Sequence, residues 1–96
     1  MWVNIDLCLV PIGVGVSLSP YIKACVKVIE RYNLRYELGP NGTAIDGEWD
    51  QVFECVKNCH EKLHSMGVLR IYTTLKVNTR LDKKQLFKEK VKSVMT

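Results

Sequence analysis

Alternation of apolar and polar residues predicts the first element of the chain. Between residues 2 and 10 the two sets are Val3, Ile5, Leu7 and Leu9 on one side and Asn4, Asp6 and Cys8 on the other. A period of two is typical of a β-strand with one buried face. Pro11, Gly13 and Gly15 then predict a loop.

Helical periodicity follows this loop. Ser19 is in the position of an N-cap, and Pro20 suits the first helical position, where its missing N–H is not needed. The apolar residues that repeat at helical spacing are Ile22, Cys25, Val26 and Ile29. We therefore expect a helix over residues 20–32.

The middle of the chain predicts a hairpin and a second helix. Residues 34–38 and 43–47 have strand character, and Gly39-Pro40-Asn41-Gly42 between them is a dense turn signal. Glu48 and Gln51 then resemble a capping box. The apolar stripe of the following helix consists of Val52, Val56, Cys59, Leu63 and Met66, and Gly67 ends it.

Residues 68–78 predict a long strand. Its two faces carry Ile71, Thr73, Leu75 and Val77 on one side and Arg70, Tyr72, Thr74 and Lys76 on the other. Asp82 and Gln85 form a further capping pair. The last helix has an apolar stripe of Phe87, Val91, Val94 and Met95.

The resulting order is β-α-β-β-α-β with an extra C-terminal helix. The small α+β fold with this order is the ferredoxin-like sandwich, in which a four-stranded antiparallel sheet carries two helices on one face. Because 96 residues is close to the commonest size of one domain, we expect residues 1–96 to form a single domain.

The face of the sheet that the helices leave open is predicted to be polar. Its residues are Asn4, Asp6, Cys8, Arg35, Glu37, Asp46, Arg70, Tyr72, Thr74 and Lys76. A solvated face would explain this composition. A mixture of acids, bases, hydroxyls and a ring on rigid strands would equally orient a ligand or form a subunit interface.

The net charge of +4 is concentrated in one segment. Residues 83–92 contain five lysines and one glutamate, so the rest of the chain is neutral overall. Such an excess is ordinarily a solvated helix face, and an anionic partner is the alternative. No exposed aromatic residue interleaves with these lysines, so we expect no nucleic-acid partner.

The cysteines and the N-terminal composition favour a cytoplasmic protein. Cys8, Cys25, Cys55 and Cys59 show no CxxC spacing, and free thiols indicate a reducing compartment. The apolar N-terminal stretch has no basic leader and is interrupted by polar residues. We therefore expect neither a signal peptide nor a membrane span.

The candidate catalytic and metal-binding residues do not form a set. His60 and His64 are four residues apart, a spacing at which two imidazoles can share a metal, but no further ligand completes the site because Cys59 faces the core. We expect boundary histidines, no metal and no cofactor. No nucleophile, base and orienting group can be assembled, so we expect no enzyme; His60 and Cys8 would be the residues to test.

Three stretches carry a family resemblance. They are VPIGVGVSLSPYI at 10–22, YELGPNGTAIDG at 36–47 and RIYTTLKVNTRLDK at 70–83. In this order and spacing the chain resembles the small YkoF-like thiamine-binding proteins, long grouped as uncharacterised. Asn41 stands where methionine is common and Cys8 where serine is common, which could alter ligand preference.

The resemblance implies non-catalytic binding of thiamine or its hydroxymethylpyrimidine moiety, by a cytoplasmic carrier or sensor in thiamine metabolism. It also implies a homo-oligomer, a dimer through the sheet face or a tetramer, with the pocket near subunit contacts. The alternative is a structural or regulatory homo-oligomer with no small-molecule ligand.

Thiamine offers an aminopyrimidine edge that needs donors and acceptors, and a thiazolium cation that favours carboxylates and rings. The expected ligand-binding residues are therefore Asp6, Ser17, Ser19, Glu37, Thr43, Asp46, Tyr72, Thr74 and Lys76. Tyr36 and Trp49 are further candidates for the ring. Several have a structural alternative, since Ser19 could only cap a helix, Thr43 could only be a strand residue, and Tyr36 alternates onto the core face.

Overall fold

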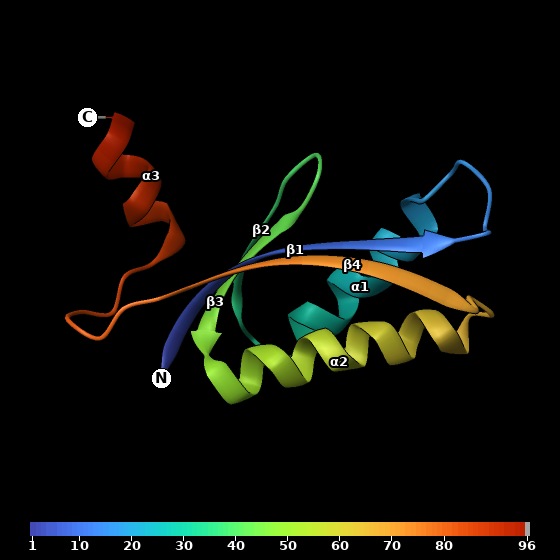
Figure 1. Cartoon of the computed structure of the whole chain (residues 1–96), viewed down its shortest axis with the longest axis horizontal. Helices are drawn as coiled ribbons and strands as arrows, with labels where there is room; N and C mark the ends of the chain where they lie inside the picture. The colour runs from blue at the N-terminus through green and yellow to red at the C-terminus, as the bar shows by residue number, and fades with distance from the viewer. Residues whose placement is uncertain (96) are drawn as a thin grey trace.

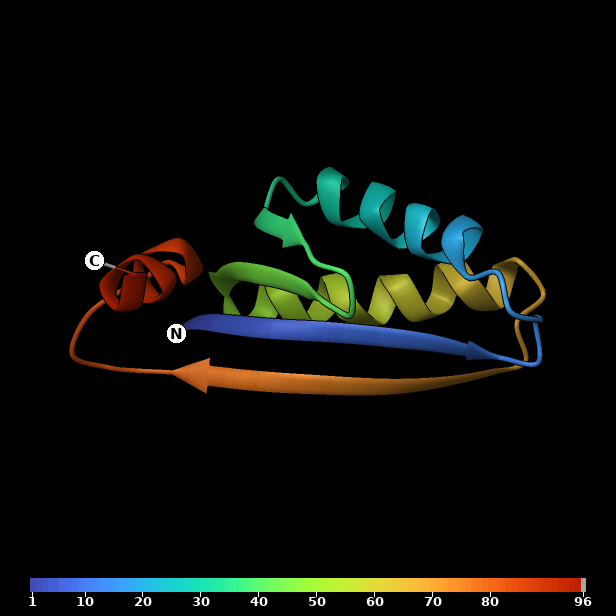
Figure 2. The same ribbon diagram turned by 90° about the horizontal axis from the view of Figure 1, so that it is seen from above.

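The computed structural model describes residues 1–95 and contains one four-stranded antiparallel sheet in the order β2-β3-β1-β4 (Figure 1). The elements are β1 (Trp2–Ile12), α1 (Ser19–Arg31), β2 (Arg35–Leu38), β3 (Thr43–Glu48), α2 (Trp49–Ser65), β4 (Arg70–Thr79) and α3 (Phe87–Met95). Helices α1 and α2 lie together on one side of the sheet, and α3 stands apart at its end (Figures 1 and 2). The predicted ferredoxin-like α+β fold with an extra C-terminal helix is confirmed.

The central strand β1 separates the two faces as its alternation predicts. Val3, Ile5 and Leu7 are buried beneath the helices at 0–4% exposure, and they form the core with residues of α1 and α2. The antiparallel register pairs Asp6 with Lys76 and Cys8 with Thr74. The residues expected on the open face therefore do share one side of the sheet, which we call the open sheet face, although Asn4 and Asp46 at one end of it are buried.

Strand β1 continues two residues further than its sequence predicts. Pro11 lies within the strand, opposite Ile71 of β4. Pairing with β3 ends at Leu7, so this part of β1 has a hydrogen-bonded neighbour on one side only. Because proline is tolerated on an unpaired edge, Pro11 does not end the strand.

The predicted helices form, but their predicted caps are only partly confirmed: Ser19 is not the N-cap of α1, whereas Glu48 is the N-cap of α2 without a side-chain capping bond. Leu18 occupies the N-cap of α1, Ser19 is already helical, and no side-chain cap bond is present. Glu48 does occupy the N-cap of α2, but its carboxylate pairs with the N-terminal ammonium at 3.0 Å. Gln51 instead donates to the carbonyl of Tyr32 at 3.1 Å.

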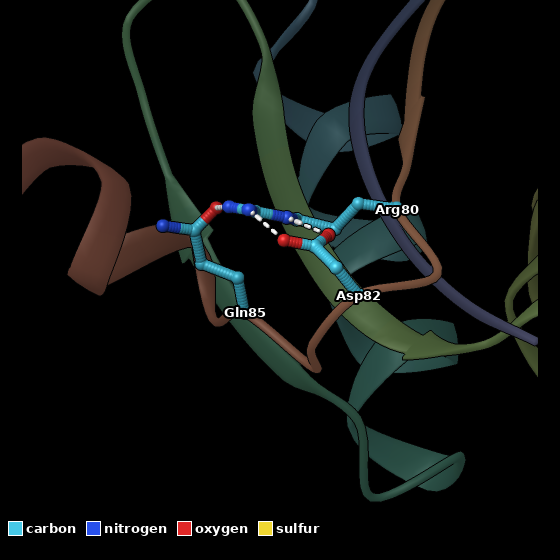
Figure 3. A network of polar contacts seen from close by, with 3 residues as sticks. All are labelled: Arg80, Asp82 and Gln85. Carbon is cyan, nitrogen blue, oxygen red and sulfur yellow. Dashed lines mark hydrogen bonds and ion pairs between the residues drawn. The ribbon is translucent and has the colours of Figure 1, made fainter.

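The third predicted cap is replaced by an arginine-centred turn before α3. Figure 3 shows Arg80 reaching both Asp82 and Gln85. Its Nε donates to Asp82 Oδ1 at 2.7 Å, and its Nη1 donates to Gln85 Oε1 at 3.2 Å. The hydrogen bond from Arg80 lowers the pKa of Asp82 to about 2. These bonds turn the chain back toward the sheet.

A buried carboxylate fixes the start of α3 against the open sheet face. Asp46 is 1% exposed, and its Oδ2 accepts a 2.8 Å hydrogen bond from the backbone N–H of Phe87. Asn4 donates to Asp46 Oδ1 and, at 2.8 Å, to the carbonyl of Gln85. The ring of Phe87 is itself 8% exposed. We call Asn4, Asp46, Gln85 and Phe87 the α3 anchor.

Replacing Asp46 with alanine should destabilise the protein by about 1–3 kcal/mol, because buried donors on Asn4 and Phe87 lose their acceptor. Urea unfolding measures the loss, and hydrogen exchange should show faster exchange across residues 85–95. Asp6→Ala is the matched control, since Asp6 is an exposed acid on the same face, and it should change stability by less than about 0.5 kcal/mol. An equal effect of the two substitutions would contradict a special role for Asp46.

Candidate functional site

A cavity of about 270 Å³ lies on the helix side of the sheet, between α1, the second half of β1 and the β2–β3 turn. Its lining residues come from four segments and include Leu7, Cys8, Leu9, Val10, Leu18, Tyr21, Ile22, Cys25, Val26, Ile29, Leu38, Gly39, Pro40, Asn41, Gly42, Thr43 and Leu63. We call this space the α1 cavity.

Unequal strand lengths create the α1 cavity. Thr43 pairs with Leu7 on one side and with Leu38 on the other, and this is the last row in which all four strands lie together. Beyond it β1 continues with β4 as its only paired neighbour, while α1 passes over the gap. The helix-facing side chain of Leu9 therefore has no β3 neighbour, and the space beside it stays open.

The β2–β3 turn forms one wall of the cavity. The N–H of Gly39 donates to the carbonyl of Gly42 at 2.8 Å, which closes the turn. A Cβ at Gly42 would lie 2.7 Å from Asp6 Oδ1, so a larger residue in the turn would require the Asp6 side chain to move. Asp6 thus lies against the back of the wall, on the open sheet face.

The lining of the α1 cavity is mainly apolar. None of the described lining residues carries an ionised carboxylate, an ammonium or a guanidinium group. The polar side chains are the hydroxyls of Tyr21 and Thr43, the amide of Asn41 and the thiols of Cys8 and Cys25. Such a lining suits an uncharged ring with a few hydrogen-bonding groups.

The structure divides the predicted ligand residues between two surfaces. Only Thr43 lines the α1 cavity, while Ser17 and Ser19 flank its lining residue Leu18. The exposed side chains on the open sheet face are Asp6, Glu37, Tyr72, Thr74 and Lys76. The residues proposed from the sequence are therefore not one cluster, and the cavity lies behind the face to which we assigned the ligand.

The carboxylate of Asp46 holds the start of α3, whereas the sequence predicts that it binds the ligand. Both of its carboxylate oxygens accept hydrogen bonds within the α3 anchor. Burial raises the pKa of Asp46, while the hydrogen bonds from Phe87 and Asn4 act in the opposite direction. A ligand could reach this carboxylate only after displacing α3.

The two additional aromatic candidates belong to the core side. Trp49 packs against Phe53 with ring centroids 4.4 Å apart, and it contacts the core. Tyr36 also packs against the core, and its hydroxyl donates to Glu30 at 3.0 Å. The alternation onto the core face predicted for Tyr36 is confirmed, and Tyr72 is the exposed ring among the three.

The apolar residues that line the cavity also fit the buried stripe of a helix, so the sequence pattern alone does not reveal the cavity. Of the apolar stripe predicted for the first helix, Cys25 and Ile29 are buried together with Ala24 and Val28, whereas Ile22 and Val26 line the cavity. Ile22 keeps 40% exposure and Leu38 keeps 54%. An excess of apolar side chains on a helix and on a facing turn was the available indication of a binding cavity.

The two histidines of α2 contact β4 and the loop that precedes it. His60 Nε2 and Thr73 Oγ1 share a 2.7 Å hydrogen bond, and His64 Nδ1 lies 2.7 Å from the carbonyl oxygen of Val68. Within residues 1–95 no cluster of three or more potential metal ligands is present. Burial and, to a smaller extent, the charge of His64 lower the pKa of His60.

This lowered pKa predicts that acidification destabilises the fold. The unfolded chain protonates His60 near pH 6.5, whereas the folded chain keeps it neutral to a lower pH. Its contribution is therefore complete above pH 6.5 and is lost as the pH falls toward the folded-state pKa. The urea midpoint should fall more between pH 7.5 and about pH 5.5 in wild type than in His60→Gln. Equal falls would contradict this assignment.

Together the sheet order and the α1 cavity define a ferredoxin-like fold with a small, mainly apolar cavity. The chain belongs to the thiamine-binding protein family, whose model matches residues 5–95. A UPF0045 protein of Synechocystis is 48% identical over 96 residues, covering 100% of this chain and 79% of that protein. A UPF0045 protein of Methanothermobacter thermautotrophicus is 37% identical over 94 residues, covering 96% and 95%.

Solved structures agree on the fold. A hypothetical protein from Methanocaldococcus jannaschii superposes with a TM-score of 0.91 at 29% identity, covering 98% of this chain and 96% of that one. A Thermotoga maritima protein, whose name proposes a role in thiamine biosynthesis or salvage, gives a TM-score of 0.84 at 22% identity, with coverage of 98% and 99%. In residues 1–95 no helix is both long and apolar enough to cross a membrane.

Proposed function

We propose that this protein binds thiamine non-catalytically, with the hydroxymethylpyrimidine moiety in the α1 cavity, as a cytoplasmic carrier or sensor. The observation that carries the proposal is an apolar cavity of about 270 Å³ in a member of the thiamine-binding family. The name of the Thermotoga maritima protein supports a connection with thiamine metabolism.

The size and charge of the cavity favour the pyrimidine over the thiazolium. Pockets for drug-sized ligands occupy roughly 300–1,000 Å³, so this cavity is suited to one substituted ring. A neutral ring enters an uncharged lining at low cost, whereas a buried cation would need a carboxylate that the lining does not offer. The thiazolium and any phosphate would then remain outside, past the turn.

Two hydroxyls are suited to the polar edge of the pyrimidine. Thr43 and Tyr21 come from different walls of the cavity, and each can donate or accept. We assign to them the orientation of the aminopyrimidine. Ser17, just before α1, and Ser19, its first residue, are both exposed, and we assign to them contacts with the part of thiamine outside the cavity.

Ligand addition followed by thermal unfolding tests this proposal. Thiamine and hydroxymethylpyrimidine at millimolar concentration should each raise the Tm, because a ligand that binds only the folded state stabilises it. Leu38→Trp replaces a lining side chain with a larger one that reduces the cavity volume, and it should weaken binding at least about tenfold (about 1.4 kcal/mol). Tyr72→Ala on the open sheet face should leave affinity within about twofold. Loss of binding in Tyr72→Ala alone would place the ligand on the opposite surface.

A homo-oligomer formed through the open sheet face is the second candidate, and it can accompany the first. Tyr72 is 64% exposed and Ile12 is 44% exposed on this face, and β4 is a ten-residue edge strand. Exposed apolar side chains beside an unpaired edge are typical of an association surface.

Native mass spectrometry should therefore detect a dimer or a tetramer. Lys76→Glu, which reverses a charge at the centre of this face, should shift the population toward monomer by at least about tenfold in dissociation constant. Lys27→Glu on the exposed side of α1 is the matched control and should leave the assembly unchanged. A monomer in the wild type, or equal effects of both variants, would exclude assembly through this face.

A further inference from the structure

Three buried thiols meet where α1 packs on α2. Cys25 of α1 is 7% exposed, and Cys55 and Cys59 of α2 are both 0% exposed. Cys25 also lines the α1 cavity, whereas neither α2 cysteine does. One thiol of the group can therefore meet a small molecule without any opening of the core.

Cys59 is in direct contact with Cys25. Its Sγ lies 3.8 Å from the backbone carbonyl oxygen of Cys25 and is within hydrogen-bonding distance of it. Hydrogen bonding from the Cys59 thiol lowers the pKa of both Cys25 and Cys55, and the pKa of Cys59 is raised. A thiolate is the reactive form of cysteine, and of the two residues with a lowered pKa only Cys25 lines the cavity.

We propose that Cys25 and Cys59 form a redox modification site that hydrogen peroxide reaches through the α1 cavity, and that oxidation links α1 to α2 by a disulfide. The Cys25 thiol loses its proton and the thiolate attacks one peroxide oxygen; the O–O bond breaks, and the leaving hydroxide takes up that proton and departs as water. Cys25 is now a sulfenic acid. The Cys59 sulfur attacks the Cys25 sulfur, the S–O bond breaks, and the hydroxide takes the Cys59 proton to leave as a second water.

Geometry selects this pair over Cys55 with Cys59. Residues four apart on one helix have Cβ atoms about 5–6 Å apart, whereas a disulfide needs about 3.5–4.5 Å. Cys25 and Cys59 lie on two facing helices, and their contact already spans the interface. Cys55 is therefore the natural control for a buried thiol that takes no part.

Tryptic digestion places the three buried cysteines in three different peptides, so a disulfide between any two of them can be identified by mass. Trypsin cleaves after lysine and arginine, so it releases Cys25 in residues 24–27, Cys55 in residues 36–57 and Cys59 in residues 58–62. A Cys8→Ser protein, which removes the other cavity thiol, is treated with hydrogen peroxide and digested without reduction. The expected product is a cross-linked pair of peptides 24–27 and 58–62, with the mass of two hydrogens lost. A cross-link to peptide 36–57, or oxidation of Cys25 without any cross-link, would overturn the proposal.

Two pairs of variants test the order of the thiol reactions and the route of the oxidant. Adding Cys55→Ala should leave the cross-link intact, whereas adding Cys59→Ala should leave Cys25 as a sulfenic acid that dimedone traps. Leu38→Trp beside the cavity should slow oxidation several-fold, and Leu69→Trp, at a 94% exposed position outside the lining, should not. Equal rates in these last two variants would refute entry through the cavity.

Protection of Cys25 by hydroxymethylpyrimidine would connect the redox site with the proposed function, and this expectation rests on that function. Hydroxymethylpyrimidine in the α1 cavity would cover Cys25, so a saturating concentration should slow formation of the cross-link at least about fivefold. A cross-link that forms at the same rate with and without this ligand would leave the disulfide established and would count against the pyrimidine in the cavity. The two proposals can therefore fail separately.

Discussion

The pairing of β1 on both of its edges is the constraint on which the rest of the molecule depends. Its register with β3 and β4 fixes which residues share a face, and a slip by one residue would turn Val3 and Ile5 toward solvent. Burial of those side chains beneath α1 and α2 opposes such a slip. The same register brings Asn4 opposite Asp46, so one strand pairing determines both the core and the α3 anchor.

The open sheet face is consequently two surfaces rather than one. Near the start of β1 it is covered by the segment leading into α3, where a buried carboxylate is stabilised by hydrogen bonds from Asn4 and from the N–H of Phe87. Further along, Tyr72, Thr74 and Lys76 remain exposed. A carboxylate that seemed suited to a cation in the sequence is thus already satisfied by the protein, because the chain that satisfies it lies some forty residues away.

Local pattern predicted the elements and their faces, and long-range partners explain where it failed. The period of two in residues 2–10 was sufficient to place Asp6 and Ile5 on opposite faces. Pro11 was assigned to a loop because the sequence does not reveal that β3 stops pairing at Leu7. Aspartate is a residue type that caps helices, but the carboxylate of Asp82 instead accepts a hydrogen bond from the nearby Arg80. The polar residues predicted a ligand site on the open sheet face, whereas the walls of the cavity are mainly apolar.

The cavity itself follows from the lengths of the strands. Because β2 has four residues and β1 has eleven, the sheet narrows after the row of Leu7, Thr43 and Leu38, while α1 continues across it. Filling the gap with larger side chains would stabilise the domain, so an open space lined by Ile22 and Leu38 has a cost in stability. A bound ring would recover the missing contacts, and the same cavity is the route by which we propose that an oxidant reaches Cys25. The proposed ligand site and the proposed thiol oxidation therefore both depend on the shortness of β2 and β3 relative to β1.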